Sequence, residues 1–230
     1  MIVGPSAYWY LTRATGAIAL ILLTLALVVG VAAIGRWRTP RWPRFVVDGL
    51  HRTSSLLAVV FLVVHIVTSV LDGFAPIGWL DAIIPFAGAY RPLWLGLGAI
   101  GFDLLVAVTV TSLLRVRIGY DEWRAVHWLA YLAWPIAVIH GFGTGSDVRL
   151  TWMMAINVVC IAAVLIAVVA RALIGWPEHR RRRLSALVGA AAFAAGLVVW
   201  LPGGPLGRNW ASRSGTPPSL LTSRSATKGA

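Results

Sequence analysis

The sequence predicts an all-α integral membrane protein in which six transmembrane helices form one bundle. Three observations predict this fold class. First, 59% of the 230 residues are hydrophobic and only 12% are charged, whereas about a quarter of the residues in a soluble domain are charged. Second, the mean hydropathy is +0.81. Third, the apolar residues gather in six runs that can each cross the membrane, a distance of about 30 Å or roughly 20 helical residues.

The six apolar runs are the expected helices. They cover residues 14–34, 53–71, 92–114, 125–143, 150–170 and 184–201. The first run could be mistaken for a secretory signal. However, no basic residue precedes Arg13, and the run exceeds the roughly 7–15 apolar residues of a signal peptide. We therefore expect a retained helix.

Basic residues occupy alternate loops and predict the orientation. Loops one, three and five carry Arg36, Arg38, Arg41, Arg44, Arg115, Arg117, Arg124, Arg171 and the run 180–183. Loops two and four carry Asp72, Asp81 and Asp147 with only Arg91 and Arg149. Because basic loops remain in the cytoplasm, we expect a multi-pass protein of the cell membrane, a bacterial inner membrane, with its N-terminus outside. The net charge of +12 then reflects topology, and we expect membrane lipid but no nucleic acid as a partner.

Residues 202–230 differ from the rest in composition. They are rich in Gly, Pro, Ser, Thr and Arg and offer little apolar surface to bury. We expect one transmembrane domain, 1–201, and a disordered polar and basic tail, 202–230, on the outer side.

Four of the five histidines form a regular pattern. His51 and His65 are fourteen residues apart on the second helix, and His127 and His140 are thirteen apart on the fourth. Both helices run outward, so His51 pairs in depth with His127, and His65 with His140. The two levels lie about 20 Å apart at 1.5 Å per residue. His179, in the segment EHRRRR, is expected to be a solvated loop residue.

The two spacings predict helices of different shape. Fourteen residues return to within about 40° of the same helix face, so His51 and His65 can face one neighbour. Thirteen residues on a straight helix end about 140° short of the starting face. The fourth helix must therefore be distorted or tilted, and Pro135 is the expected kink.

Two opposed imidazoles suit a metal with two axial positions, and haem iron is the best fit. Zinc fits less well, because it needs four ligands and no Cys, Asp or Glu lies at either level. The single cysteine, Cys160, excludes covalent CxxCH attachment. The competing interpretation is four unrelated histidines bonded to carbonyl groups, which we disfavour because ionisable groups within a membrane usually serve a function. The predicted fold is therefore a six-helix bundle holding two stacked haems.

The two histidine segments, WPRFVVDGLHRTSSLLAVVFLVVH and YDEWRAVHWLAYLAWPIAVIH, share a charged start, a histidine, an apolar stretch and a second histidine. With these spacings, residues 7–172 resemble the ferric reductase-like transmembrane haem domain. Ferric reductases, NADPH oxidases and the bacterial haem subunit of the periplasmic methionine sulfoxide reductase system share this domain. The resemblance implies two b-type haems that carry electrons outward. Their axial ligands would be His51, His127, His65 and His140.

The closest likeness is to compact bacterial members, because the sequence ends without a flavin and nicotinamide domain. The resemblance therefore implies a separate cytoplasmic electron donor, either a quinol or a flavin reductase that carries FMN or FAD. It also implies an acceptor or redox partner at the outer face. Ferric chelate, quinone, a flavoprotein and a molybdenum reductase all stay open as acceptors.

Haem propionates need cations near the membrane faces. Arg52 and Arg124 suit the inner level, and Arg13 and Arg91 suit the outer level. An ordinary interfacial charge is an equally good interpretation of each arginine.

Three other kinds of residue carry expectations. Trp134 and Phe61 lie between the two levels and could fill the gap between the haems, although plain packing is favoured. Asp103 should face the bundle, either bonded to Thr or His or in its neutral form, because a lone carboxylate is costly in lipid, and a proton relay is the functional alternative. An interfacial aromatic belt accounts for the tryptophans near helix ends, which include Trp9, Trp79, Trp123, Trp152 and Trp200.

The leading hypothesis is a transmembrane haem b electron-transfer oxidoreductase. One alternative is a quinol-linked cytochrome b anchor of a partner reductase or dehydrogenase. An alternative of another class is a haem-free scaffold or small transporter. No catalytic residue is predicted, because the sequence has no Walker motif, no GxGxxG after a strand, and no nucleophile with a base at usable spacing.

Overall fold

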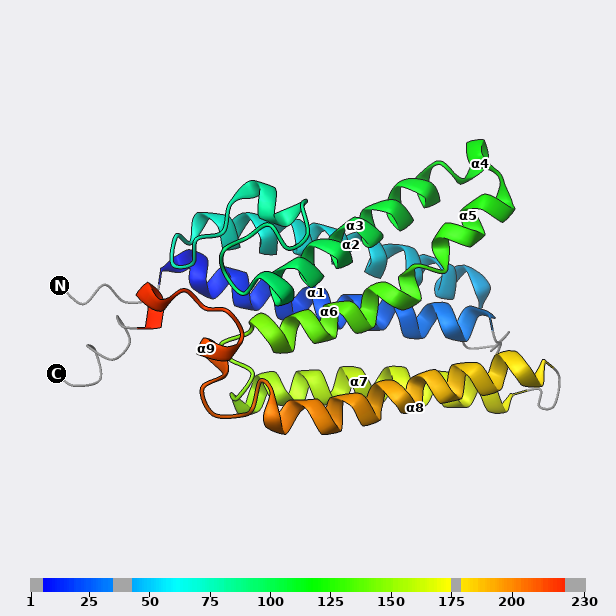
Figure 1. The fold of residues 1–230 in the computed structure, drawn as a ribbon. Coiled ribbons are helices and arrows are strands. Elements are labelled where there is room, and N and C mark those ends of the chain that lie inside the picture. The colour runs from blue at the N-terminus through cyan, green and yellow to red at the C-terminus, as the bar shows by residue number, and fades with distance from the viewer. Residues whose placement is uncertain (1–5, 35–42, 175–178, 222–230) are drawn as a thin grey trace.

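A computed structural model describes residues 6–34, 43–174 and 179–221 of the chain. Within these ranges all regular secondary structure is helical. Six helical segments there are long and apolar enough to cross a membrane, and they run along a common direction (Figure 1). The prediction of an all-α, multi-pass membrane protein is confirmed.

The membrane-spanning helices are α1 (Ala7–Ile34), α2 (Arg44–Leu71), α3 (Pro92–Leu113), the pair α5 (Tyr120–His127) and α6 (Ala130–Thr144), α7 (Thr151–Leu173) and α8 (Arg180–Gly203). The shorter elements are η1 (Trp79–Ala82), α4 (Arg115–Ile118) and α9 (Trp210–Arg213).

The two ends of the bundle differ, and each needs a name. The start of α1, the 72–91 loop and α9 lie at one end, which we call the terminal end (Figure 1). The α4 turn and the start of α8 lie at the other end, which we call the basic end because it carries Arg115, Arg117 and the run 180–183. The first-loop residues Arg36, Arg38 and Arg41 lie outside the described residues.

Several helices start earlier than predicted. α1 begins at Ala7 and α2 at Arg44, whereas the apolar runs begin at 14 and 53. Apolar runs measure the hydrocarbon-spanning part only, and a helix continues where polar side chains reach the headgroup region. His51 therefore lies about two turns inside α2.

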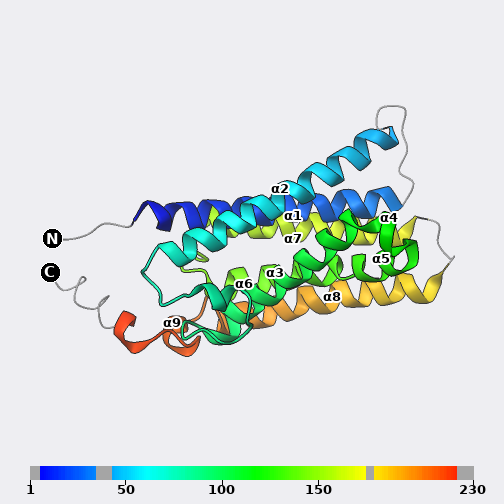
Figure 2. The same ribbon diagram turned by 90° about the horizontal axis from the view of Figure 1, so that it is seen from above.

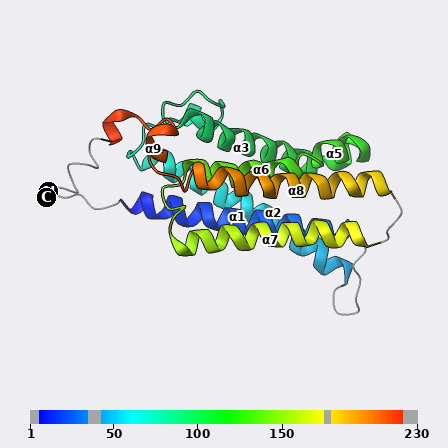
Figure 3. The same cartoon turned by 60° about the horizontal axis from the view of Figure 1, so that its bottom comes forward.

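The helices pack as a layered bundle. α1 packs along α2 and α7, α3 packs along α6, and α8 packs along α7. Figure 2 shows α2 and α8 on opposite sides, with the other long helices between them. Figure 3 shows α7 beside α1. This arrangement leaves α1, α2, α3 and α6 to enclose the space between the histidines.

The apolar core lies on the other side of α6. Trp134, Val138 and Phe142 of α6 pack there with Val164 of α7 and Leu197 of α8. The Trp134 indole donates a hydrogen bond to Thr24 Oγ1 at 2.9 Å. Trp134 is therefore a packing residue, which is the role that we favoured from the sequence.

The fourth span is broken, as the thirteen-residue histidine spacing requires, but the break precedes Pro135. α5 ends at His127 and α6 begins at Ala130. Around this break, the Leu129 amide donates a hydrogen bond to the Val126 carbonyl at 2.9 Å. The Leu132 amide donates one to the Leu129 carbonyl at 3.0 Å. Such three-residue turns advance about 120° per residue instead of 100°. The tight turns therefore supply part of the roughly 140° of rotation that His140 needs in order to face the same side as His127.

The segment after α8 packs against the terminal end, where the sequence predicted a disordered tail. The Trp210 indole of α9 donates to Gly143 O at 3.1 Å. The hydroxyl of Thr216 accepts from Arg91 Nε at 2.9 Å. These residues satisfy polar groups at helix ends and so order a segment that has little apolar surface. Residues 222–230 lie outside the described residues.

Asp103 does not face the bundle interior as expected. It lies near the middle of α3 and is exposed. Among the described residues, no hydrogen bond or ion pair is found for its carboxylate. Its neighbours on α3 are apolar in every direction, so the sequence contained no signal of which face is buried.

Candidate functional site

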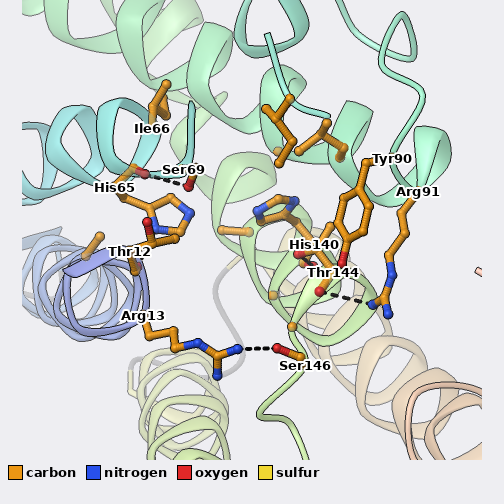
Figure 4. A pocket seen from close by; sticks show the side chains of 18 of the residues that line it. Thr12, Arg13, His65, Ile66, Ser69, Tyr90, Arg91, His140, Thr144 and Ser146 are labelled. Carbon is orange, nitrogen blue, oxygen red and sulfur yellow. Dashed lines mark hydrogen bonds between the residues drawn. The ribbon is translucent and has the colours of Figure 1, made fainter. Parts of the chain in front are cut away.

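A cavity of about 440 Å³ opens at the terminal end. Residues of α1, α2, α3 and α6 line it, among them His65 and His140. The two imidazole rings face each other across the cavity (Figure 4). The structure thus brings together the pair that the sequence assigned to the outer level.

His65 of α2 is held by α1. Its Nδ1 donates a hydrogen bond to Thr12 O at 2.7 Å. The ring rests on Gly16, where an added methyl group would lie only 2.9 Å from His65 Cε1. A helical side chain covers the turn before its own Cα, so glycine at 16 leaves the Thr12 carbonyl accessible. We call this pairing, a helical glycine with the carbonyl four residues before it, a glycine notch.

His140 of α6 occupies a second glycine notch, on α3. Its Nδ1 donates to Trp94 O at 2.8 Å, and an added methyl group at Gly98 would overlap the imidazole ring. The Trp94 indole stacks on Trp200 with centroids 5.1 Å apart. The terminal-end pair is therefore anchored from both sides.

His51 of α2 occupies the third glycine notch. Its Nδ1 donates to Ala26 O at 2.9 Å, and a methyl group added at Gly30 would lie 3.2 Å from His51 Cε1. The ring centroids of His51 and His127 are 6.1 Å apart. This separation leaves room for one metal ion between the rings, since a histidine nitrogen binds a metal at roughly 2 Å.

His127 is the exception. Its Nδ1 is buried, and no hydrogen-bond partner is found for it within the described part of the chain. The ring instead stacks on Trp123, with centroids 4.9 Å apart and planes at 30°. Arg115 lies over the same indole at 4.6 Å. His127 is thus held by an aromatic contact rather than by a backbone carbonyl.

Arg13 lines the terminal-end cavity. It forms an ion pair with Asp147. It also donates a hydrogen bond to Ser146 (Figure 4). Its guanidinium also lies over the Trp9 ring at 3.4 Å. Arg13 therefore joins α1 to the loop between α6 and α7.

Arg91 also lines the cavity and is only 4% exposed. Its guanidinium donates to Gly143 O and Thr144 O, each at 3.0 Å. These are carbonyls of the last turn of α6, which have no partner within the helix. Arg91 therefore caps the helix that carries His140.

The arginines predicted for the inner level have different surroundings. Arg52 and Arg124 are both exposed. Neither lines the terminal-end cavity. Arg52 directly follows His51, and Arg124 shortly precedes His127. Both arginines lie at the basic end of the bundle.

Sequence reasoning missed the glycines of the notches. Gly16 and Gly30 are fourteen residues apart on α1, the same spacing as the histidines that they receive on the antiparallel α2. That matched spacing is the signal that could have found them. The contact of Trp123 with the His127 ring was also not foreseen, because a tryptophan near a helix end is already accounted for by the interfacial belt.

Comparisons with known proteins match part of the chain. The family model of the ferric reductase like transmembrane component matches residues 14–138. The heme-binding subunit MsrQ of protein-methionine-sulfoxide reductase from Caulobacter vibrioides is 34% identical over 119 residues, which are 50% of this chain and 52% of that protein. The chain thus matches about half the length of this curated relative. No solved structure matches. The chain belongs to the ferric reductase-like transmembrane family.

Proposed function

We propose that this protein carries electrons across the membrane through two b-type haems, each held between two histidines. The observation that carries the proposal is the arrangement of four histidines as two facing pairs at two depths of one bundle. The name of the Caulobacter relative, a heme-binding subunit of a reductase, supports the same function.

The residues fit such a group. Three glycine notches fix the imidazoles of His51, His65 and His140 through Nδ1. A histidine whose Nδ1–H is bonded to a carbonyl presents Nε2 as the metal-binding nitrogen. A bound haem would supply one-electron oxidation and reduction of its iron, and the two histidines of each pair would hold it. The protein holds each group in place and shields it from water.

The arginines are proposed to neutralise haem propionates. Arg13 and Arg91 border the terminal-end cavity, and both also fix neighbouring elements through Asp147 and Gly143. Because arginine has five N–H donors, one guanidinium can hold a helix end and a propionate together. Arg52 and Arg124 would serve the pair at the basic end.

The charge pattern gives the direction of electron flow. Under the positive-inside rule the basic end faces the cytoplasm. Electrons would then enter near His51 and His127 and leave near His65 and His140. The proposed donor is a separate flavin reductase carrying FMN or FAD, or a quinol. The proposed acceptor is a redox partner outside the membrane.

Electron transfer across a vesicle tests this function. The haem-loaded chain is inserted into lipid vesicles that contain ferricyanide, and dithionite is added outside. We expect the trapped ferricyanide to lose its colour with the intact chain but not with His51→Ala or His140→Ala. A colourless chain that takes up no haem would contradict the proposal and favour a scaffold or transporter.

The choice of donor is tested on the same preparation. Haem reduction is followed spectrally after adding a quinol or a flavin reductase with its reduced nicotinamide. Reduction by the flavin reductase would identify the flavoprotein, of the two proposed donors, as the one that serves this protein. Reduction by quinol alone would instead favour the cytochrome b anchor of a partner enzyme.

A further inference from the structure

The glycine notches reveal where a fourth one should be. α1 carries two notches fourteen residues apart, at Gly16 and Gly30, for the two histidines of α2. α3 carries one, at Gly98, for His140 of α6. The position fourteen residues after Gly98, at the depth of His127, is Ser112. α3 packs against α5 there, so this is the equivalent position for His127.

Ser112 places a side chain over the carbonyl four residues before it, whereas glycine leaves this carbonyl accessible in the three glycine notches. Its hydroxyl donates to Val108 O at 2.6 Å, which is the carbonyl four residues earlier. Ser112 Oγ in turn accepts from Trp123 Nε1 at 3.1 Å. The carbonyl that would receive His127 Nδ1 is therefore already bonded to a side chain of its own helix.

The state of His127 agrees with this reading. Its Nδ1 is buried and has no hydrogen-bond partner among the described residues. The ring rests on Trp123, the same residue that bonds Ser112. Ser112, Trp123 and His127 thus form one connected group that replaces the glycine notch.

We infer that Ser112 is a positioning residue for His127, and that it weakens this histidine as an axial ligand by occupying the carbonyl that the other three histidines use. The inference rests on the proposed function. A hydrogen bond from the second ring nitrogen makes a histidine a stronger donor to its metal, and hydrogen bonding around the ligands sets the potential of haem iron. A histidine without that bond stabilises the oxidised iron less. The haem at the basic end therefore has a higher midpoint potential than glycine at position 112 would give.

Ser112→Gly tests the inference. The full-length, haem-loaded variant is titrated optically, and its low-spin EPR spectrum is recorded. We expect the midpoint potential of the basic-end haem to fall and its EPR signal to shift, while the terminal-end haem keeps both. Two unchanged potentials in a folded, fully loaded variant would overturn the inference. A parent protein that binds no haem would overturn the proposed function instead.

Ser185→Gly is the control for general effects of a glycine in a helix. It removes a back-bonded hydroxyl from α8, which donates to Arg182 O at 2.9 Å, at an exposed position. We expect both midpoint potentials to stay unchanged in this variant. A shift in Ser185→Gly equal to that in Ser112→Gly would overturn the role assigned to Ser112.

The reverse substitution serves if Ser112→Gly fails to fold. Gly30→Ser places a hydroxyl where it competes for Ala26 O, the carbonyl that His51 uses. Because His51 and His127 face the same space, we expect the potential of the basic-end haem to rise. A fall or no change in that variant would contradict the account. Nitrogen-15 NMR of the histidines in haem-free protein gives a second readout, with three bonded Nδ1–H groups expected in the parent and four in Ser112→Gly.

Discussion

The two ends of the bundle hold histidine pairs of nearly the same sequence spacing in different ways. At the terminal end, His65 and His140 both donate Nδ1 to a helix carbonyl and both rest on a glycine. At the basic end only His51 does so, and His127 depends on the Trp123 ring. The repeat places the pairs, but the neighbouring helices decide how firmly each ring is held.

The surroundings of the two pairs also differ, and again the terminal end is held by more contacts. At the terminal end, Arg91 bonds to Thr216 and to the end of α6, and Trp210 of α9 bonds to the same helix end. At the basic end the nearby arginines Arg52 and Arg124 are exposed. We therefore expect the terminal-end site to be rigid and sensitive to packing, and the basic-end site to tolerate more change.

The largest effect should follow removal of a histidine. His65→Ala and His140→Ala should each remove the same haem and leave about one haem per chain, because the two rings face one cavity. His51→Ala and His127→Ala should remove the other. The pyridine haemochrome assay gives the count, and optical spectra identify the haem that is lost. The comparison fails if His51 and His140 behave as partners.

A methyl group in a glycine notch should have the next largest effect. Clearance is smallest at Gly98, larger at Gly16 (2.9 Å) and larger again at Gly30 (3.2 Å). Overpacking a tight site typically costs about 1–3 kcal/mol. We expect haem retention in the alanine variants to fall most for Gly98, less for Gly16 and least for Gly30.

Gly189 supplies the matched control, because nothing lies within 4 Å of a methyl group added there. Gly189→Ala should keep full haem content. Equal losses at Gly98, Gly30 and Gly189 would mean that the losses come from the helices in general and not from the notches.

Arg91→Ala should destabilise the fold more than removal of an arginine at the basic end. Arg91 is 4% exposed and donates to two carbonyls at the end of α6. A hydrogen bond from a charged group contributes about 1.5–3 kcal/mol, so we expect a loss of that order in the free energy of unfolding. Arg124→Ala, at an exposed position, should change it by less than about 0.5 kcal/mol. Thermal unfolding in detergent compares the two, and equal losses would remove the difference between the ends.

The smallest effect is expected for Trp210→Phe. This substitution keeps an aromatic ring beside Trp94 and removes the hydrogen bond to Gly143 O. A neutral hydrogen bond contributes roughly 1 kcal/mol, and unfolding measurements should show a loss of that size. Trp152→Phe, on the exposed face of α7, is the control and should leave stability unchanged. A Trp210 variant as stable as the control would show that α9 does not brace the terminal end.

The sequence predicted what depends on periodicity. The six spans follow from apolar length, the depth of each histidine follows from its spacing, and the break in the fourth span follows from thirteen residues not completing the required turns. Each of these needs only helix geometry and the thickness of the membrane. The position of the break was not predictable in this way, because proline acts on the carbonyl four residues before it, which is that of Tyr131, whereas the break lies between His127 and Ala130.

The face that each helix buries, and the hydrogen-bond partner of each histidine, could not be predicted from periodicity. α3 is apolar on all sides, so nothing in its sequence placed Asp103 at an exposed position or Gly98 against His140. The 204–221 segment buries little apolar surface and is ordered by hydrogen bonds to helix ends, which composition does not reveal. The role of Ser112 depends on which carbonyl each histidine reaches, and that requires coordinates.

The most direct test of the central claim is the number and pairing of haems in the purified, fully loaded chain. A pyridine haemochrome assay combined with an optical redox titration measures both. We expect two b-type haems per chain with two separate midpoint potentials, one lost with either His65 or His140 and the other with either His51 or His127. A chain that binds one haem or none, or whose two potentials respond to a His51–His140 pairing, would contradict it.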